Sequence, residues 1–368
     1  MNKTKLSLAL GALLTTGSFS VQAATNMQLE ERIKALEAGL DATATAVEQS
    51  GSTSKTTIGG YGELHYNNLD KNGTDSKKID FHRFVLFFAH EFNEDIRFFS
   101  EMELEHSIAG ESKAGEVELE QAYIEFDIND TTQVTAGLFL VPVGIINETH
   151  EPPTFYGVER NPVEKNIIPA TWWEAGAGIS GQIGDAGLSY DLAYTSGLKV
   201  DATTVSIRGG RQKVSKADAE SFMIAARLKY TGIAGLELAG TLISQNDMSQ
   251  DKTDTLGGGK LLEMHAVWNT GPVTLKALHA QWDIDGAAPG QDDQNGRYFE
   301  ASYKVSDKLG VFARANQWEV DSSGKKKQND FGVNYWPHED VVIKFDVQQQ
   351  NSDAGNADGY NIGVGYQF

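Results

Sequence analysis

The sequence predicts an all-β fold, a 16-stranded antiparallel transmembrane β-barrel preceded by a short α-helical coiled-coil segment. Three observations predict this fold. From residue 56 onward apolar and polar residues alternate, as they do from Tyr360 to Phe368. No apolar run beyond the N-terminal region approaches the ~20 residues that a transmembrane helix needs. The connections between the predicted strands alternate between short and long, as in an up-and-down membrane barrel.

Residues 1–23 have the pattern of a signal peptide. Lys3 and Lys5 precede an apolar stretch over residues 6–14, and small residues lead to a predicted cleavage after Ala23. The alternative is an N-terminal membrane anchor, but an apolar stretch this short cannot span a bilayer core of ~30 Å. We therefore expect the chain to be exported.

Residues 24–55 are predicted to form a periplasmic coiled-coil segment and a linker. A helix this short is marginal alone, so association of several copies is the natural way to bury its apolar seam. The alternative is a single amphipathic helix packed on the periplasmic rim of the barrel. The apolar seam consists of Leu29, Ile33, Leu36, Leu40 and Val47.

The predicted barrel occupies residues 56–368. The connections after even-numbered strands are tight, and those after odd-numbered strands are longer, for example 67–78, 142–171 and 197–218. An even strand count places both ends of the barrel on the periplasmic side. The sixteen strands are expected near residues 56–66, 79–92, 95–107, 117–128, 132–141, 172–184, 186–196, 219–231, 234–246, 260–270, 272–283, 296–306, 308–320, 328–337, 339–350 and 358–368.

Charged residues are expected to line the lumen. A charge on the lipid face near the midplane costs ~2–4 kcal/mol, so the polar face of each strand points inward. These charges have no partners nearby in the sequence, and sixteen strands enclose more volume than side chains fill, which predicts a water-filled interior. The predicted pore wall comprises Glu63, Arg97, Glu101, Glu103, Glu105, Glu125, Asp127, Arg227, Arg314 and Lys344.

Residues 81–88 of the second strand are apolar on both faces. Either a subunit contact or a folded-in loop would cover the apolar side chains of this strand that point into the barrel.

The connection over residues 142–171 is the longest and holds five of the eight prolines. A loop of this length and stiffness is expected to have a function, and we predict that it folds into the barrel and narrows the pore. The alternative is an external cap that packs against a neighbouring subunit. The predicted constriction comprises Glu148, His150, Glu151, Tyr156, Glu159, Arg160, Glu164 and Lys165.

Composition excludes several classes of function. The chain has no cysteine, which excludes disulfides and thiol chemistry. Without the signal peptide, which carries two lysines and no acids, the formal charge is 29 − 51 = −22, so nucleic-acid binding by charge is excluded. The eight histidines show no metal-ligand spacing, and no nucleophile elbow is present. We therefore predict no cofactor and no enzymatic activity.

Two segments resemble the phosphate-selective porin O and porin P family. They are Thr57-Ile58-Gly59-Gly60-Tyr61-Gly62-Glu63-Leu64-His65-Tyr66 and Ala136-Gly137-Leu138-Phe139-Leu140-Val141-Pro142-Val143-Gly144. The resemblance implies a sixteen-stranded barrel, usually trimeric, with the third loop folded inward. Some trimeric porins also carry an N-terminal periplasmic coiled coil. Anion-selective members commonly have a lysine where this chain reads Leu138-Phe139-Leu140, so the resemblance is carried to fold and transport class only.

These observations together predict a porin of the Gram-negative outer membrane, with its N-terminal segment in the periplasm. Small hydrophilic solutes and ions would cross it by passive diffusion, with a weak preference for cations. The alternative is a substrate-specific channel for small anionic solutes (phosphate or organic acids) or for sugars, in which Arg160, Arg208 and Arg211 would gather an anion. The expected partners are outer-membrane lipid, two further copies in a homotrimer and small solutes.

Overall fold

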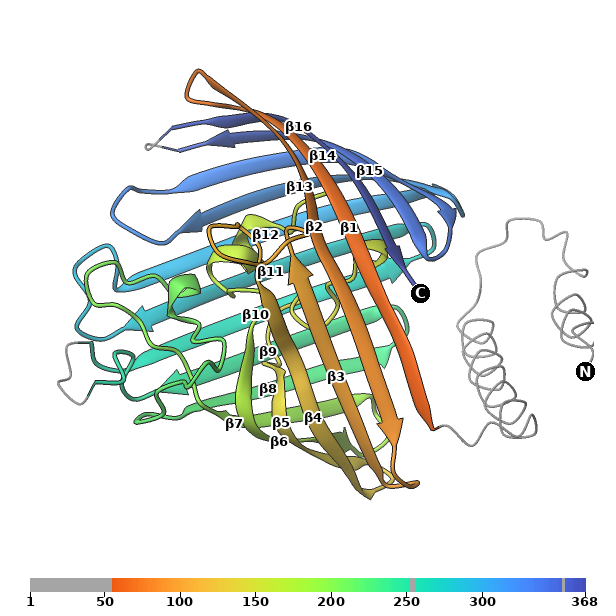
Figure 1. Ribbon diagram of the computed structural model, residues 1–368, viewed down its shortest axis with the longest axis vertical. Helices are drawn as coiled ribbons and strands as arrows, with labels where there is room; N and C mark the ends of the chain where they lie inside the picture. The colour runs from red at the N-terminus through yellow and green to blue at the C-terminus, as the bar shows by residue number, and fades with distance from the viewer. Residues whose placement is uncertain (1–54, 252–255, 353–354) are drawn as a thin grey trace, which may run out of the picture. The chain divides into compact units, whose positions relative to one another are not determined.

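The computed structural model describes residues 55–251, 256–352 and 355–368. The chain divides into two units, Met1–Thr53 and Ser54–Phe368, and the described residues belong to the second. This unit is a closed barrel of sixteen strands, which confirms the predicted fold class (Figure 1). The signal peptide predicted for residues 1–23 lies outside the described residues, and so do the coiled-coil segment and linker predicted for residues 24–55, apart from Lys55.

Each strand pairs antiparallel with its neighbours in sequence, and β1 pairs with β16 to close the barrel. Phe368 completes the closure, since it exchanges two backbone hydrogen bonds of 2.9 Å with Gly60. The strands are β1 (Thr56–Lys71), β2 (Thr74–Glu91), β3 (Ile96–Glu105), β4 (Val117–Asn129), β5 (Thr132–Leu140), β6 (Trp173–Ile183), β7 (Leu188–Thr195), β8 (Met223–Ile233), β9 (Leu236–Gln245), β10 (Gly259–Thr270), β11 (Val273–Ile284), β12 (Asp293–Ser306), β13 (Leu309–Glu319), β14 (Lys326–His338), β15 (Val341–Asn351) and β16 (Ala357–Gln367).

The alternation along each strand separates an apolar outer face from a polar inner one. In β15, Ile343 and Phe345 are exposed, whereas Lys344 and Asp346 between them are only 2% and 4% exposed. Side chains of successive strand residues point to opposite faces, so the exposed apolar set faces outward and the buried charged set faces the lumen. This alternation is the physical basis on which the charged wall residues were predicted to point into the lumen.

The first connection is much shorter than predicted. Residues 67–78 were expected to form a loop, but they continue both strands, and the turn between β1 and β2 contains only Asn72 and Gly73. Both residues have positive φ, 55° and 80°, and Gly73 N–H donates to Asp70 Oδ1 at 2.6 Å. Asn-Gly is the preferred pair for a two-residue hairpin turn with positive φ at both positions. The polar composition of the segment hid this turn signal.

The described residues contain three short helices: η1 (Pro152–Thr154), α3 (Pro162–Asn166) and η2 (Arg208–Gly210). Pro162 stands in the first turn of α3, where its missing N–H has no consequence, and the Asn161 side chain caps the helix by accepting from Glu164 N–H at 2.8 Å. None of the helices in the described ranges is long and apolar enough to cross a membrane.

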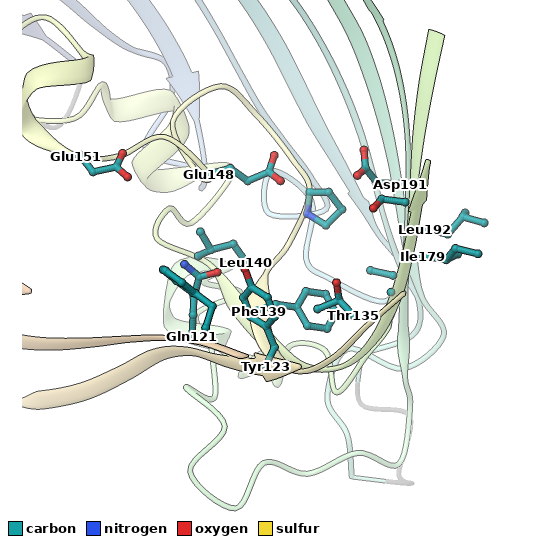
Figure 2. A pocket seen from close by; sticks show the side chains of 15 residues that line it. Gln121, Tyr123, Thr135, Phe139, Leu140, Glu148, Glu151, Ile179, Asp191 and Leu192 are labelled. Atoms are coloured by element: carbon teal, nitrogen blue, oxygen red, sulfur yellow. The ribbon is translucent and has the colours of Figure 1, made fainter. Parts of the chain in front are cut away.

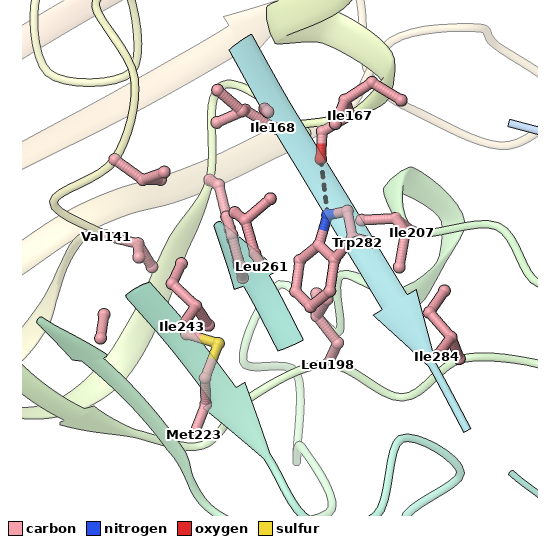
Figure 3. Packing of buried hydrophobic residues seen from close by; sticks show 14 of the residues in the cluster. Val141, Ile167, Ile168, Leu198, Ile207, Met223, Ile243, Leu261, Trp282 and Ile284 are labelled. Carbon is pink, nitrogen blue, oxygen red and sulfur yellow. Dashed lines mark hydrogen bonds between the residues drawn. The ribbon is translucent and has the colours of Figure 1, made fainter. Parts of the chain in front are cut away.

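One side of the lumen is filled by apolar side chains rather than by water (Figure 3). Ile243 and Leu261 are buried, while the next residues, Leu242 and Leu262, are exposed, so the buried pair faces inward. Loop residues such as Ile167 and Leu198 cover this inner wall, and Trp282 Nε1 donates to Ile167 O at 2.9 Å. The prediction of a water-filled interior was wrong here, because two long loops bring their own apolar side chains into the barrel.

Candidate pore constriction

The connection between β5 and β6, residues 141–172 and hereafter loop 141–172, contacts the opposite wall of the barrel. The contacts that define this opposite wall lie on β13, β14 and β15, which are at least six steps around the barrel from β5 and β6 in either direction. The loop therefore crosses the lumen. Its hydrogen bonds to this wall are Trp336 Nε1 to Pro153 O (3.4 Å), Asn334 Nδ2 to Phe155 O (3.1 Å), Arg314 Nη1 to Tyr156 O (3.3 Å), Lys344 Nζ to Gly157 O (2.9 Å) and Val158 N to Asp346 Oδ2 (2.7 Å).

Glu164 holds the loop in its folded shape. The carboxylate is fully buried and accepts from the backbone N–H groups of Ile145 (2.8 Å) and Ile146 (2.6 Å). It also accepts from Tyr298 Oη of the wall at 2.8 Å. A buried carboxylate with several donors is a structural support. Glu164 was predicted to border the constriction, but the structure places it inside the loop, where a passing solute does not meet it.

Three other predicted constriction residues meet side chains of the wall. Each forms a charged contact between the loop and a different part of the barrel, so the loop is fixed on several sides. The contacts are Glu148 with Arg227 of β8, His150 Nε2 with Glu101 Oε1 of β3 (3.3 Å), and Glu159 Oε1 with His65 Nδ1 (3.2 Å) and Asn67 Nδ2 (3.1 Å) of β1.

The apolar inward face of the second strand is covered by the loop. Val85 is fully buried, and Tyr61 of β1 packs against Phe87 at 5.7 Å between ring centroids. The imidazole of His150 meets the Tyr61 ring edge-on at 5.9 Å. We expected either a subunit contact or a folded-in loop to cover this face, and the structure shows the folded-in loop.

A cavity of about 370 Å³ lies beside the loop (Figure 2). Glu148 and Glu151 border it from the loop, and Asp191 borders it from β7. Figure 2 shows the Asp191 carboxylate on the lumen side of the strand and the Leu192 side chain on the other side. This cavity is the acidic part of the candidate pathway.

The remaining predicted constriction residues have different surroundings. Tyr156 packs against the rings of Phe312 (5.5 Å) and Trp336 (5.6 Å) and belongs to the loop's attachment to the wall. Lys165 is exposed on α3. Arg160 Nη1 donates to Thr171 Oγ1 at 2.6 Å.

Four arginines whose side chains face the lumen from the barrel wall, hereafter the wall arginines, are each in contact with two carboxylates. Most of these partners come from adjacent strands in register, such as Asp330 opposite Arg314 and Asp191 opposite Arg227. The shortest contacts of each are Arg83 with Glu63 (2.8 Å) and Glu103 (3.6 Å), Arg97 with Glu125 (2.7 Å) and Asp127 (2.6 Å), Arg227 with Asp191 (2.8 Å) and Glu148, and Arg314 with Glu300 (3.2 Å) and Asp330 (3.1 Å).

Three further arginines, Arg160, Arg208 and Arg211, hereafter the loop arginines, have a different environment. Within the described ranges none of them lies within 4.0 Å of a carboxylate oxygen. Arg208 Nη1 donates to Ala170 O (2.8 Å) and Lys165 O (3.1 Å), and Arg211 Nη1 donates to Thr171 O. Nε and Nη2 of Arg160 are buried without a hydrogen-bond partner among the described residues.

The loop arginines border a cavity of about 150 Å³ together with Arg83 and Lys213. Burial, together with the positive charges of Arg211 and Arg160, lowers the pKa of the Arg208 guanidinium. Carboxylates line the same cavity but lie beyond ion-pair distance of the loop arginines, and they are Glu105, Glu116, Glu118 and Glu120. The cavity therefore offers guanidinium donors to an anion.

Two wall residues, Arg83 and Asp330, were not predicted. Arg83 was missed because it stands in a strand that is apolar on both faces. Asp330 was missed because its role depends on the register with Arg314, which appears only when the strands are paired. Among predicted wall residues, Lys344 is occupied by the Gly157 carbonyl and lies over the Phe155 ring at 3.6 Å.

A closed sixteen-stranded barrel with an apolar outer face, a charged inner face and a loop across its lumen is the architecture of an outer-membrane channel. The chain belongs to the family of phosphate-selective porins O and P, whose model matches residues 57–368. The protein is accordingly an outer-membrane porin, a channel for passive diffusion of small hydrophilic solutes.

Individual proteins are similar to this chain in sequence or in structure. A protein of Aquifex aeolicus (strain VF5), described as an uncharacterized protein, is 29% identical over 351 residues, covering 84% of this chain and 79% of the relative. An anion-selective porin from Comamonas acidovorans is similar in structure, with a TM-score of 0.62 and 14% identity over 86% of this chain and 100% of that one. OmpF of Salmonella typhi, in complex with daunomycin, has a TM-score of 0.61 and 13% identity over 86% and 98%.

Proposed function

We propose that loop 141–172 narrows the lumen and that the porin weakly prefers cations. The observation that carries the preference is the surplus of buried acids. Among the described residues ten Asp and Glu side chains are buried, against four Arg and Lys side chains (Arg83, Arg227, Arg314 and Lys344) and three histidines (His65, His150 and His265). Water-filled passages between low-dielectric walls concentrate the field of such charges, so cations accumulate and anions are depleted.

The test is the reversal potential of the purified protein in a planar bilayer across a potassium chloride gradient. A potential of the sign expected for potassium permeation supports the proposal. A potential of the sign expected for chloride would overturn it. The same recording at high salt is expected to show a smaller preference, because the Debye length falls to ~3 Å at 1 M.

A second candidate function is a channel selective for small anionic solutes, such as phosphate or organic acids. The observation that favours it is the group of loop arginines, whose buried donors have no carboxylate partners among the described residues. Guanidinium groups bind carboxylate and phosphate through paired hydrogen bonds. Addition of phosphate or succinate during the chloride recording separates the two candidates, since only a selective channel would show saturable block of the current.

We also propose that the chain assembles as a homotrimer, that residues 24–55 lie in the periplasm and that residues 1–23 are removed. The heptad spacing of Leu29 to Val47 supports association, and the short connections at the end of the barrel where β1 begins support the periplasmic position. Conductance that closes in three equal steps and a mature N-terminus at Ala24, measured by mass spectrometry, are the expected results. A single closing step would argue against the trimer.

A further inference from the structure

A group of two histidines and one aspartate lies on the inner wall beside the constriction. Asp80 and His82 belong to β2, and His106 follows the last residue of β3. His82 is the additional residue of a β-bulge, because β1 residues Glu63 and Leu64 pair with Arg83 and Phe81. His106 has φ of 54°, and its N–H donates to His82 O at 3.1 Å, which turns its side chain back toward β2.

Both imidazoles direct the same type of nitrogen at the same carboxylate. His82 Nδ1 lies 3.1 Å from Asp80 Oδ2, and His106 Nδ1 lies 2.8 Å from Oδ2 and 3.0 Å from Oδ1. One ligand atom from each residue lies within 4.8 Å of the others. In a tetrahedral zinc site, bond lengths of ~2.0–2.1 Å place ligand atoms ~3.3 Å apart. The separations in the structure, at most 4.8 Å, therefore exceed those of a zinc site by no more than about 1.5 Å.

From this geometry we infer that Asp80, His82 and His106 form a binding site for a divalent first-row transition-metal ion. Two neutral imidazoles and one carboxylate are a ligand set for Zn²⁺, Cu²⁺ or Ni²⁺, whereas Ca²⁺ and Mg²⁺ prefer oxygen ligands alone. The side chains of Asp80, His82 and His106 are 29%, 24% and 33% exposed, so an ion in the lumen can reach them. The remaining coordination position is open to water or to a solute.

The surroundings hold the site in place. His65 stacks on His82 with ring centroids 4.7 Å apart and an interplanar angle of 16°. The two nitrogens of His65 are occupied by Glu63 (3.0 Å) and Glu159 (3.2 Å), so His65 supports the His82 ring and leaves metal binding to the other three residues. Fixed partners of this kind strengthen metal sites.

The position of the site gives bound metal a consequence for transport. His65 connects it to Glu159 of loop 141–172, and the site lies toward the end of the barrel that carries the long connections. A divalent ion there would place positive charge beside an acidic part of the passage. Bound metal would therefore lower potassium current and reduce cation preference. Metal binding itself stands independently of the proposed selectivity.

The test is titration of the folded full-length protein with Zn²⁺ by isothermal calorimetry, with Co²⁺ absorption as a second probe of imidazole ligation. We expect one ion per chain in the wild type. His106→Ala, which alters a residue outside the strands, is expected to weaken binding roughly tenfold or more. The matched control is His338→Ala, which removes an exposed histidine from a group of His338, Glu339 and Asp340 and is expected to leave the affinity unchanged.

Two results would overturn the site. One is the absence of stoichiometric Zn²⁺ binding by protein that shows heat-modifiable mobility and therefore a folded barrel. The other is unchanged binding by the double variant H82A/H106A, which would assign the ion elsewhere, for example to the buried group of Glu101, Glu120 and His150. Conductance is recorded in parallel without added metal. A normal conductance there shows that the channel is intact, so that the result for metal binding is independent of the result for ion selectivity.

Discussion

The wall arginines and the loop arginines are the same side chain in two electrostatic settings. Arg314 lies between Glu300 and Asp330 on strands in register, and its side chain is 4% exposed. Arg208 donates to backbone carbonyls, and Arg160 and Arg211 add positive charge around it. The barrel thus neutralises every wall arginine described above but leaves the loop arginines without carboxylate partners among the described residues.

The difference separates charges that serve the fold from charges that a solute can meet. A buried guanidinium with two carboxylates has little charge left to offer, and removing it leaves buried anions unpaired. A guanidinium held only by carbonyl oxygens keeps its charge and further donors for an incoming anion. Substitution of a loop arginine should therefore change selectivity more than stability, and substitution of a buried wall arginine should change stability more than selectivity.

The largest expected effect is that of Arg314→Met. The substitution leaves Asp330 buried without its counter-charge and Glu300 with only the more distant Lys276 at 3.7 Å, which we expect to lower the free energy of unfolding by about 3–5 kcal/mol. Urea unfolding followed by heat-modifiable mobility measures it. Arg97→Met is the matched control, since Arg97 is 32% exposed and its pairs should contribute less than about 1 kcal/mol. Equal effects of the two substitutions would contradict the distinction between buried and exposed wall pairs.

A smaller effect is expected for Lys344→Met. The variant loses the hydrogen bond to the Gly157 carbonyl and the contact with the Phe155 ring. Together these losses should lower the free energy of unfolding by about 1–3 kcal/mol. Because these contacts attach loop 141–172 to the wall, single-channel recordings should show more current noise. Lys276→Met is the control, since Lys276 lies 3.7 Å from Glu300 and that ion pair does not involve the loop. Noise that rises equally in both variants would exclude a specific effect on the loop.

The smallest effect on stability is expected for Arg160→Gln. It removes one hydrogen bond to Thr171 and also relieves repulsion within the loop arginines, so the free energy of unfolding should change by less than about 1 kcal/mol. The permeability ratio of potassium to chloride should rise roughly twofold, because a unit charge ~8 Å from an ion in water is worth ~0.5 kcal/mol.

Arg297→Gln carries the same change in charge at an exposed residue outside the cavity of the loop arginines and serves as the control. The reversal potential across a salt gradient compares the two variants. An equal shift of the reversal potential in both variants would mean that only net charge matters. It would contradict a distinct role of the loop arginines in selectivity.

The strands were predictable from the sequence because successive residues of a membrane-barrel strand face lipid and lumen in turn, so that apolar and polar residues alternate. Ile343, Lys344 and Phe345 show the alternation without knowledge of any neighbour. The exception, the turn at Asn72 and Gly73, was also present in the sequence, and it was missed because the polar residues around it were assigned to a loop.

The partners of the charges were not predictable in the same way. Arg314 and Asp330 are sixteen positions apart, and only the register of β13 with β14 brings them together. The covering of Ile243 by loop side chains depends equally on tertiary structure. The acidic composition therefore indicated a charged lumen, but its division into paired and unpaired sites required the fold.

The most direct test of the central claim, that loop 141–172 crosses the lumen and reaches the far wall, is a disulfide between loop and barrel. A side chain introduced at Gly363 of β16 would place its Cβ 3.6 Å from the Cβ of Val158, within the range of ~3.5–4.5 Å that disulfides require. The chain has no cysteine to compete.

We predict that the double variant Val158→Cys/Gly363→Cys forms an intramolecular disulfide on mild oxidation of the folded protein, detected by mass spectrometry. Both single variants should retain a free thiol under the same conditions. Reduced, unreacted cysteines in a folded double variant would contradict the account, because a loop outside the lumen would hold the two residues apart.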